Sequence, residues 1–331
     1  MYTKLKLKFY STILFLFFFE FAQGQVAGTL GFVGKSPLAQ SFTFSVSSLD
    51  FSSANVTARI INNGAKPVTT SGILWGFSVP TIISYTGITT NGNIAGNNYT
   101  NTMTGLAIGG TYYIVAYATN EAGTSYGNVL TYTHGTVYNA TTGKTWLAVN
   151  LGATAFPSSI SDSAGYGTLY QWGRLSDGHQ YVRPTASSAT SSLSSSDVPN
   201  NGGLFIVPGS SPYDWRSGQN ANLWQGVSGI NNPCPSGFRL PTTTEFTNEK
   251  NSWNAGNADY GAFTSVLKLT YCGRRYVNNT NPQQYVGIWG YYWTSDTYNQ
   301  NSYFFRIRNT AAPDIAGDSR GSALAVRCIQ N

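Results

Sequence analysis

Charged residues, histidine, cysteine and methionine are all scarce in this 331-residue sequence. Only 10% of its residues are charged, and it contains two His, three Cys and two Met. Disordered chains and coiled coils carry far more charge, so both classes are excluded. Aromatic residues, in contrast, make up 15% of the chain. The sequence therefore encodes a globular protein, and its length suggests about two domains that each bury a core.

Clustered basic residues are missing as well. The formal net charge is +6, but Lys4, Lys6 and Lys8 lie at the extreme N-terminus. Elsewhere the basic residues are scattered singly, apart from Arg274 and Arg275. Nucleic-acid binders need Lys and Arg clustered along one face to neutralise phosphates. We therefore expect no nucleic acid among the partners.

The sequence has one long apolar run, and it lies at the N-terminus. Residues 9–21 follow the basic start, and Ala22 and Gly24 offer small residues at a cleavage position. We predict that residues 1–24 are a secretory signal peptide, because roughly 13 apolar residues fall short of the ~20 that span a bilayer. A transmembrane anchor is the rival interpretation. Residues 25–35 then form a linker, and the protein is predicted to be secreted or held at the outer cell surface, with no membrane span after signal cleavage.

Export permits disulfides, and three cysteines leave one over. Cys234 lies in a proline-rich polar segment and Cys328 lies close to the C-terminus, whereas Cys272 follows the apolar, strand-like run 266–271. We predict a disulfide between Cys234 and Cys328. Cys272 is then expected to be a small buried thiol, which is the common fate of free cysteine.

Residues 36–134 alternate apolar and polar positions between turn residues, with strands predicted at 41–46, 56–61 and 72–77. This spacing favours a β-sandwich. Residues 106–128 resemble strands E to G of a fibronectin type III-like domain. The resemblance implies that Tyr113 hydrogen-bonds to the upstream backbone and that Tyr113, Val115 and Tyr117 face the core. It also implies a hairpin loop at residues 120–123.

From residue 135 to the end the regular alternation of residues 36–134 gives way to a series of motifs. Thr242 and Glu245 have capping-box spacing, so a short helix is predicted to begin there. Strands are predicted at 288–295, 302–308 and 322–329. The motifs that carry a family resemblance lie at residues 143–153, 169–174, 177–180, 233–245, 292–295 and 326–329.

Together these motifs closely resemble the Fibrobacter succinogenes major paralogous domain family, over residues 135–331. The resemblance implies a variant of the C-type lectin-like fold, in which helices flank a twisted antiparallel sheet and the two ends of the domain meet. It also implies a bridge between an early and a late cysteine, which agrees with Cys234 and Cys328. The predicted fold is thus mainly β with a few short helices, an N-terminal β-sandwich followed by a C-terminal C-type lectin-like α+β domain.

No complete catalytic motif is present. Asp177-Gly178-His179 is interpreted as a turn with a solvated or hydrogen-bonded His, rather than as an acid–base pair. Two carboxylates can flank a sugar in glycosidases, but capping explains Glu245, and Glu249 is expected to be a solvated helix residue. We therefore predict a protein that is not an enzyme and has no catalytic residues.

Metal and cofactor sites are not expected either. Thiolate and imidazole ligands need close spacing, and His134 and His179 are isolated. Calcium needs six to eight oxygen ligands, and the C-terminal tail offers only Asp296, Asp314 and Asp318 as carboxylates. Calcium-dependent sugar binding is therefore a minority hypothesis.

Aromatic, amide and hydroxyl side chains are concentrated between residues 276 and 309. Such a mixture suits carbohydrate stacking or protein contacts. Trp293 is assigned to the core, and alternation predicts that Tyr303, Phe305 and Ile307 point inward while Phe304, Arg306 and Arg308 point outward. The candidates for a ligand-binding face are Tyr285, Trp289, Tyr291, Asp296, Tyr298, Asn299 and Asn301.

The sequence therefore predicts a secreted or cell-surface binding or adhesion protein whose lectin-like domain recognises extracellular carbohydrate or a surface protein. One alternative is a glycan-processing enzyme whose carboxylates converge only in the folded chain. Another is a hypervariable ligand-binding receptor, because lectin-like domains of this kind are sometimes diversified in their C-terminal segment, which is rich in Asn and Tyr at residues 291–301.

Overall fold

The computed structural model describes residues 37–91, 98–181, 189–253, 260–277 and 283–331. The predicted signal peptide and linker, residues 1–24 and 25–35, lie outside this part of the chain. Strands dominate and the helices are short, which confirms a mainly β fold with a few short helices. Within the described residues, no hydrogen-bonded ladder joins strands β1–β7 to strands β8–β18.

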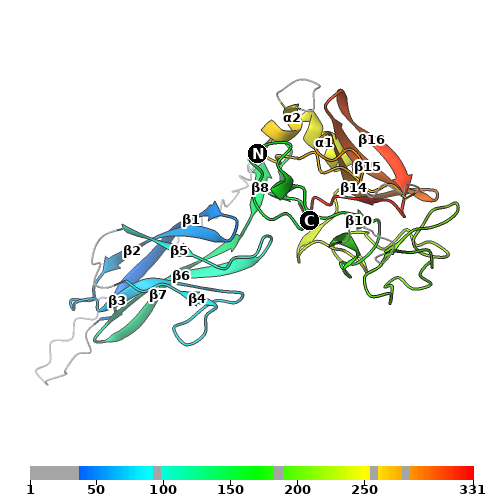
Figure 1. Ribbon diagram of the computed structural model, residues 1–331. Coiled ribbons are helices and arrows are strands. Elements are labelled where there is room, and N and C mark those ends of the chain that lie inside the picture. The colour runs from blue at the N-terminus through cyan, green and yellow to red at the C-terminus, as the bar shows by residue number, and fades with distance from the viewer. Residues whose placement is uncertain (1–36, 92–97, 182–188, 254–259, 278–282) are drawn as a thin grey trace, which may run out of the picture. The chain divides into compact units, whose positions relative to one another are not determined.

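Strands β1 to β7 form a three-stranded sheet, β1-β2-β5, and a four-stranded sheet, β4-β3-β6-β7, both antiparallel (Figure 1). Apolar side chains from both sheets, such as Val56, Ile60, Ile73 and Ile114, form one buried core between them. This is the predicted β-sandwich. The strand bounds are β1 Gln40–Asp50, β2 Ser53–Asn62, β3 Thr70–Gly76, β4 Gly87–Ile88, β5 Asn98–Met103, β6 Thr111–Asn120 and β7 Gly123–Thr133.

The tyrosine that bonds to the upstream backbone is Tyr112, so the prediction for Tyr113 is wrong by one residue. The Tyr112 hydroxyl accepts a hydrogen bond from the Ala107 N–H at 2.9 Å, and its ring is buried in the sandwich core. Tyr113 is only half-buried. The alternation of a strand is strict, so this shift changes the face assigned to every side chain along β6.

Val115 and Tyr117 are buried on the opposite face of β6, not in the core between the sheets as predicted. The Tyr117 hydroxyl donates to the Thr89 carbonyl at 3.1 Å, next to β4. Chain from the β3–β4 region thus covers this second face. Since both faces of the strand are covered, both are apolar, and the sequence pattern alone does not reveal which one faces the core.

Strands β8 to β18 form several small sheets, and the first strands pair with the last. The order β13-β18-β9-β8 places Ile329 of β18 opposite Trp146 of β9. The two ends of this part of the chain therefore meet, as the family resemblance implies. The bounds are β8 Thr136–Asn139, β9 Lys144–Leu147, β10 Tyr170–Gln171, β11 Ala189–Thr190, β12 Phe205–Ile206, β13 Phe238–Arg239, β14 Trp289–Tyr298, β15 Asn301–Arg308, β16 Ala311–Ser319, β17 Ala323–Leu324 and β18 Ile329–Gln330.

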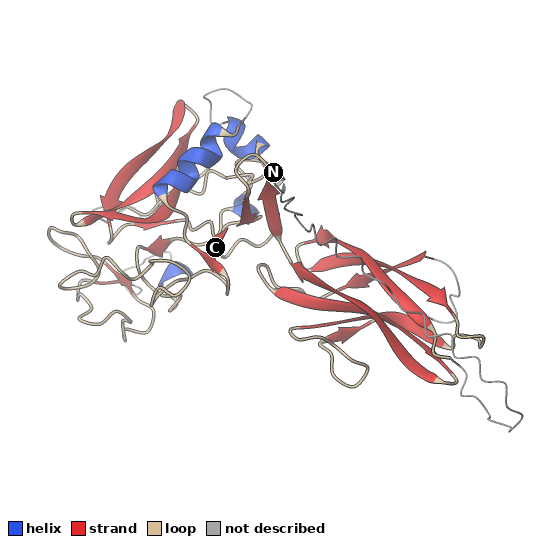
Figure 2. Cartoon of the chain, turned by 180° about the vertical axis from the view of Figure 1, so that it is seen from behind, coloured by secondary structure: helices blue, strands red, loops and turns tan. Residues whose placement is uncertain are grey.

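Two α-helices are described, α1 (Thr243–Asn251) and α2 (Tyr260–Thr264). The predicted capping box starts α1: the Thr242 hydroxyl accepts from the Glu245 N–H, and the Glu245 carboxylate accepts from the Thr242 N–H. Figure 2 shows α1 beside the antiparallel sheet β14-β15-β16. Phe246 of α1 stacks on Phe305 of β15 with ring centroids 4.8 Å apart. This contact fixes the helix on one face of the sheet.

The other face of this sheet is also covered over part of its length. Phe304, predicted to point outward, is buried there against Trp293 and Tyr291. The prediction for Phe304 is therefore wrong, whereas the inward positions of Phe305 and Trp293 are confirmed. Two apolar layers, one on each face, explain why alternation along β15 misleads.

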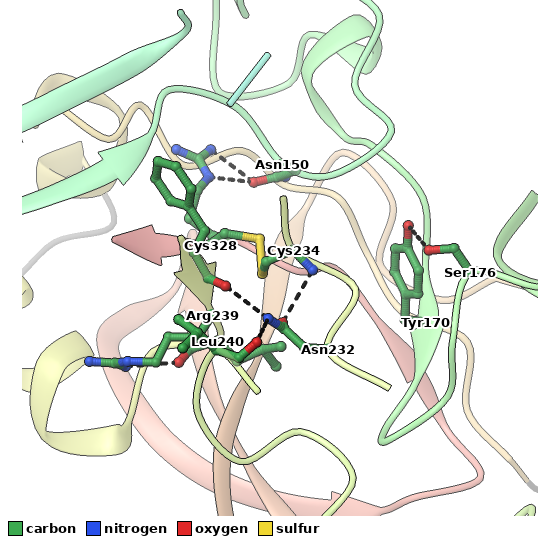
Figure 3. Close-up of a disulfide and its surroundings, with 11 residues drawn as sticks. Asn150, Tyr170, Ser176, Asn232, Cys234, Arg239, Leu240 and Cys328 are labelled. Carbon is green, nitrogen blue, oxygen red and sulfur yellow. Dashed lines mark hydrogen bonds between the residues drawn. A yellow bond between two sulfur atoms is a disulfide. The ribbon is translucent and has the colours of Figure 1, made fainter. Parts of the chain in front are cut away.

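The predicted disulfide between Cys234 and Cys328 is present (Figure 3). Cys272 is a buried free thiol. The segments around two of these cysteines are less regular than predicted. Residues 266–271, before Cys272, form no strand, and residues 322–329 contain only β17 and the first residue of β18. The bridge joins Cys328 to the irregular segment around Cys234, beside the β9–β18 ladder.

Candidate ligand-binding site

The seven residues predicted to bind a ligand lie at the two ends of β14 and do not form one face. Tyr285, Trp289 and Tyr291 lie at its start, and the other four lie at or near the hairpin to β15. A ten-residue strand is about 30 Å long. Trp293 between the two groups is fully buried. The structure thus separates the candidates into an aromatic group and a polar group.

A tight turn forms the aromatic group. The Trp289 N–H donates to the Tyr285 carbonyl at 2.9 Å, and Gly287 within the turn has a φ of 74°, which favours glycine. The turn lays the Tyr285 ring on the Trp289 ring, with centroids 4.1 Å apart and planes inclined by 9°. We call this stacked pair the aromatic platform.

The Tyr285 half of the platform is exposed and strained, whereas Trp289 is half-buried. Tyr285 is 40% exposed, and its φ of 60° lies in the left-handed region that a bulky residue rarely adopts. That conformation costs about 1–2 kcal/mol. The Trp289 indole N–H donates to the Asn309 carboxamide at 3.2 Å, which fixes its ring. Strain of this kind, held in place by neighbours, is typical of functional positions.

Tyr291 is not part of the exposed face, so its assignment to that face is corrected. Only 1% of the residue is exposed, and burial raises the pKa of its hydroxyl to about 12. The guanidinium of Arg274 lies 4.9 Å from the Tyr291 ring centroid and 4.6 Å from that of Tyr276, and it pairs with Asp318 at 3.1 Å. Tyr291 therefore supports Arg274, which the sequence offered only as half of an Arg-Arg dipeptide.

Charged groups flank the platform on the neighbouring strand. Arg308 lies opposite Trp289 in the β14–β15 ladder. Arg306 and Arg308 both bind the Asp314 carboxylate, at 2.7 and 2.9 Å. This contact raises the pKa of Arg306. The half-buried guanidinium groups were correctly predicted to point outward, and they present fixed N–H donors beside the aromatic rings.

The same turn borders a hollow with a volume of about 290 Å³. Val286 lines it from the turn, while Tyr166, Gln180, Tyr181 and Arg275 line it from other segments. The hydroxyl, amide and guanidinium groups of this wall are suited to hydroxyl-bearing ligands. Its size is just below the range of small-molecule sites, so the hollow extends the platform rather than enclosing a ligand.

One member of the polar group, Asp296, lines a second, open hollow. Tyr303, Asn222 and Gln225 line it as well. The Asp296 carboxylate accepts from the backbone N–H and hydroxyl of Thr243 at 2.7 and 2.6 Å, so it also stabilises the first turn of α1.

The remaining three candidates lie at the hairpin itself. Tyr298 packs on Tyr303 with ring centroids 4.4 Å apart. Asn299 is exposed and has a φ of 49°, a conformation that Asn adopts more readily than other residues with a side chain. Asn301 is half-buried at the start of β15. These side chains form a turn and a ring pair, which leaves the aromatic platform as the flatter and more exposed aromatic surface.

The Asp177–His179 pair is fully engaged by the protein. His179 is buried, and its Nδ1 lies 2.7 Å from the Asp177 carboxylate. Its Nε2 accepts the Gln171 N–H at 3.1 Å, which fixes the neutral tautomer. Burial lowers the pKa of His179 to about 4. Neither ring nitrogen is available to a substrate, in agreement with the interpretation of this motif as a hydrogen-bonded turn.

The two helix carboxylates are also engaged. Glu245 binds the Arg239 guanidinium at 2.7 and 2.8 Å, and its pKa falls to about 2 because hydrogen bonds from Arg239 and the Thr242 N–H outweigh desolvation, which raises it. Glu249 was expected to be solvated, but it is fully buried. It accepts from the Asn139 carboxamide at 2.8 Å, and burial raises its pKa.

The acidic residues considered for calcium each have another partner. Asp314 binds two arginines, Asp318 binds Arg274, and Asp296 binds Thr243. Within the described ranges, no group of three or more His, Cys, Asp or Glu side chains is placed to hold a metal ion.

Two solved structures that resemble this chain each match less than a third of it. A structure described as a myokine structure shares 14% sequence identity, with a TM-score of 0.23, over 29% of this chain and 97% of that chain. The sixth fibronectin type III domain of human fibronectin type III domain containing protein 3 shares 19%, with a TM-score of 0.22, over 32% of this chain and 91% of that chain. No protein-family model and no curated protein matches the sequence.

No helix in the described part of the chain is both long and apolar enough to cross a bilayer.

Proposed function

We propose that this protein is an exported binding protein whose C-terminal part, a C-type lectin-like domain of the Fibrobacter succinogenes major paralogous type, recognises carbohydrate at the aromatic platform. The carrying observation is the stacked pair formed by the exposed Tyr285 and the half-buried Trp289. Sugar rings have apolar C–H faces and polar edges, so they bind where a flat aromatic surface lies next to hydrogen-bond donors.

Three further features support a ligand at this surface. Arg308 lies opposite Trp289 in the β14–β15 ladder and carries a positive charge that Asp314 holds in place. The hollow beside Val286 extends the surface with hydroxyl and amide groups. Tyr285 retains a strained backbone conformation although Gly or Asn would adopt it at a lower cost. A residue kept at the expense of stability at an exposed position is expected to serve binding.

The test is binding of the purified protein to an array of neutral and acidic glycans, with and without a calcium chelator. Substituting Trp289→Ala should weaken binding about 30-fold, because a central aromatic anchor contributes about 2 kcal/mol or more. Tyr285→Asn should also weaken it. This second variant should keep its melting temperature, because relief of backbone strain offsets the lost ring stack, worth about 0.5–1.5 kcal/mol.

Tyr85→Ala is the matched control, because Tyr85 is a similarly exposed aromatic in the loop between β3 and β4. It should leave glycan binding unchanged. Binding that survives both platform variants would reject the platform as the site. A blank array for the wild-type protein would reject carbohydrate as the ligand class and favour a protein partner.

A further inference from the structure

A polar groove lies between α1 and the turn that joins β8 to β9. Its first hollow has a volume of about 350 Å³. Thr142 and Lys144 line one side, and Asn248 and Asn251 of α1 line the other. None of the groove's lining residues belongs to the aromatic platform or to the hollow beside it. The sequence motifs gave no indication of it, because its walls come from segments about a hundred residues apart.

A second hollow, of about 450 Å³, continues the groove past the end of α1. It lies between Asn139, Trp253 and Thr264. Thr141 and Ser252 line both hollows, so the two form one continuous groove. Each hollow is within the size range of small-molecule sites.

A buried carboxylate holds the walls of this groove together. Glu249 accepts from the Asn139 carboxamide at 2.8 Å, and from the Thr142 hydroxyl and the Trp253 indole N–H, both at 3.4 Å. One side chain of α1 is thus bonded to β8, to the following turn and to the segment after the helix. The groove is therefore preformed, which lowers the entropic cost of binding.

The charges along the groove are already balanced. Lys144 pairs with Glu245 at 3.6 Å, and Glu245 is also held by Arg239. The other polar side chains that line the groove carry amides, hydroxyls and one indole. A neutral ligand rich in hydroxyl groups matches this lining, because amides and hydroxyls both donate and accept hydrogen bonds.

Asn248 and Asn251 lie one turn apart on the exposed surface of α1, and their carboxamides make no hydrogen bond to another described group. Asn248 lies within α1, where Asn costs about 0.5 kcal/mol relative to Ala, and Asn251 is the last residue of the helix. The exposed Asn248 therefore weakens a helix of only nine residues. A residue that weakens the helix and makes no stabilising contact within the protein indicates a functional surface.

We propose that this groove is a second carbohydrate site, which takes one or two units of a neutral oligosaccharide. Asn248 and Asn251 bond the sugar hydroxyls, and Trp253 offers an apolar ring face at the far end. The inference shares only its ligand class with the proposed function, because the two sites have different residues. Two separate sites would let one chain grip a long polysaccharide with higher avidity than either site alone.

The test is calorimetric titration of the purified protein with β-1,4-linked tetrasaccharides of glucose, xylose and mannose. The double variant Asn248→Ala with Asn251→Ala should lose one binding event, seen as a fall in stoichiometry from two to one or as at least tenfold weaker binding at that site. Its melting temperature should rise slightly, because Ala favours helix. Thr244→Ala, an exposed α1 position that does not line the groove, is the control and should bind as wild type.

Trp289→Ala separates the two proposals. If Trp289→Ala loses one binding event and the double Asn variant loses the other, both sites are established. If the double Asn variant binds as wild type, the groove proposal is overturned, whatever Trp289→Ala does. If Trp289→Ala binds as wild type while the double Asn variant loses all binding, the platform is overturned and the groove stands. No heat with any tetrasaccharide overturns the groove.

Discussion

Arg327 and Asn150 are joined inside the core by two hydrogen bonds, from the guanidinium Nε and Nη2 to one carboxamide oxygen at 2.9 and 2.8 Å. The Asn150 end of this contact is visible in Figure 3. Arg327 is fully buried, and desolvation lowers its pKa to about 10. Its Nη1 donates to the carbonyls of Leu147 and Leu267. One cation thus connects three segments through neutral oxygens.

Substituting Arg327→Leu should therefore destabilise the protein strongly. It would leave the Asn150 oxygen and two backbone carbonyls buried without donors, and loss of such a buried network costs about 3–5 kcal/mol. Urea denaturation measures the change in the free energy of unfolding. The control is Arg59→Ala, an exposed arginine whose loss should change stability by less than about 0.5 kcal/mol. Equal effects of the two variants would contradict the account of Arg327.

Two variants test which side chains of β6 face the sandwich core. Tyr112→Phe removes the acceptor for the Ala107 N–H and should cost about 1–2 kcal/mol. Tyr113→Phe removes a hydroxyl from a half-buried side chain and should have almost no effect. Chemical denaturation of both variants measures the difference, and a larger loss for Tyr113→Phe would restore the original prediction for this strand.

Thiol chemistry tests the cysteine assignment. Burial raises the pKa of Cys272 to about 11, and the thiolate is the reactive form. The native protein should therefore show no reaction with a thiol reagent such as dithiobis-nitrobenzoate. Unfolding without a reductant should release one reactive thiol, and unfolding with a reductant should release all three. A thiol that reacts in the native protein would place Cys272 at the surface.

Stability should fall as the solution is acidified below pH 6.5. The pKa of His179 is about 4 in the folded chain and 6.5 ordinarily, so the unfolded chain binds a proton that the native state does not. This contribution is complete above pH 6.5 and is lost as pH falls toward 4, by about 2 kcal/mol at pH 5.

His179→Gln should reduce the difference in unfolding free energy between pH 7 and pH 5. His134, whose pKa is also lowered by burial, is unchanged in this variant, and so is Glu249, whose raised pKa acts in the opposite direction. Urea titrations at the two pH values isolate His179. An identical acid response in variant and wild type would show that His179 is not held in its neutral form.

Local chemistry explains what the sequence could predict. The capping box at Thr242 and Glu245 is a short-range pattern, and it forms as expected. The Cys234–Cys328 bridge follows from the number and setting of the cysteines. The alternating strands of the sandwich have clear turns between them, so their positions are recovered although the phase of β6 is not.

The misses share one physical cause, which is coverage from both sides. Phe304, Tyr291 and Glu249 lie where a second layer, contributed by distant segments, covers a face that would otherwise be solvated. Hydrophobic alternation reports one covered face only. The groove beside α1 was missed for a related reason, since its walls come from distant segments that meet through contacts such as those of the buried Glu249.

The central claim, that carbohydrate binds at the aromatic platform, is tested most directly by following the indole N–H signals of the wild-type protein by NMR during titration with a glycan that it binds. Trp289→Phe assigns the Trp289 signal. This signal should move, because the indole is fixed beside the platform by Asn309, while the buried indole of Trp172, bonded to the Thr294 carbonyl, should not. A saturating glycan that leaves the Trp289 signal in place would contradict the claim.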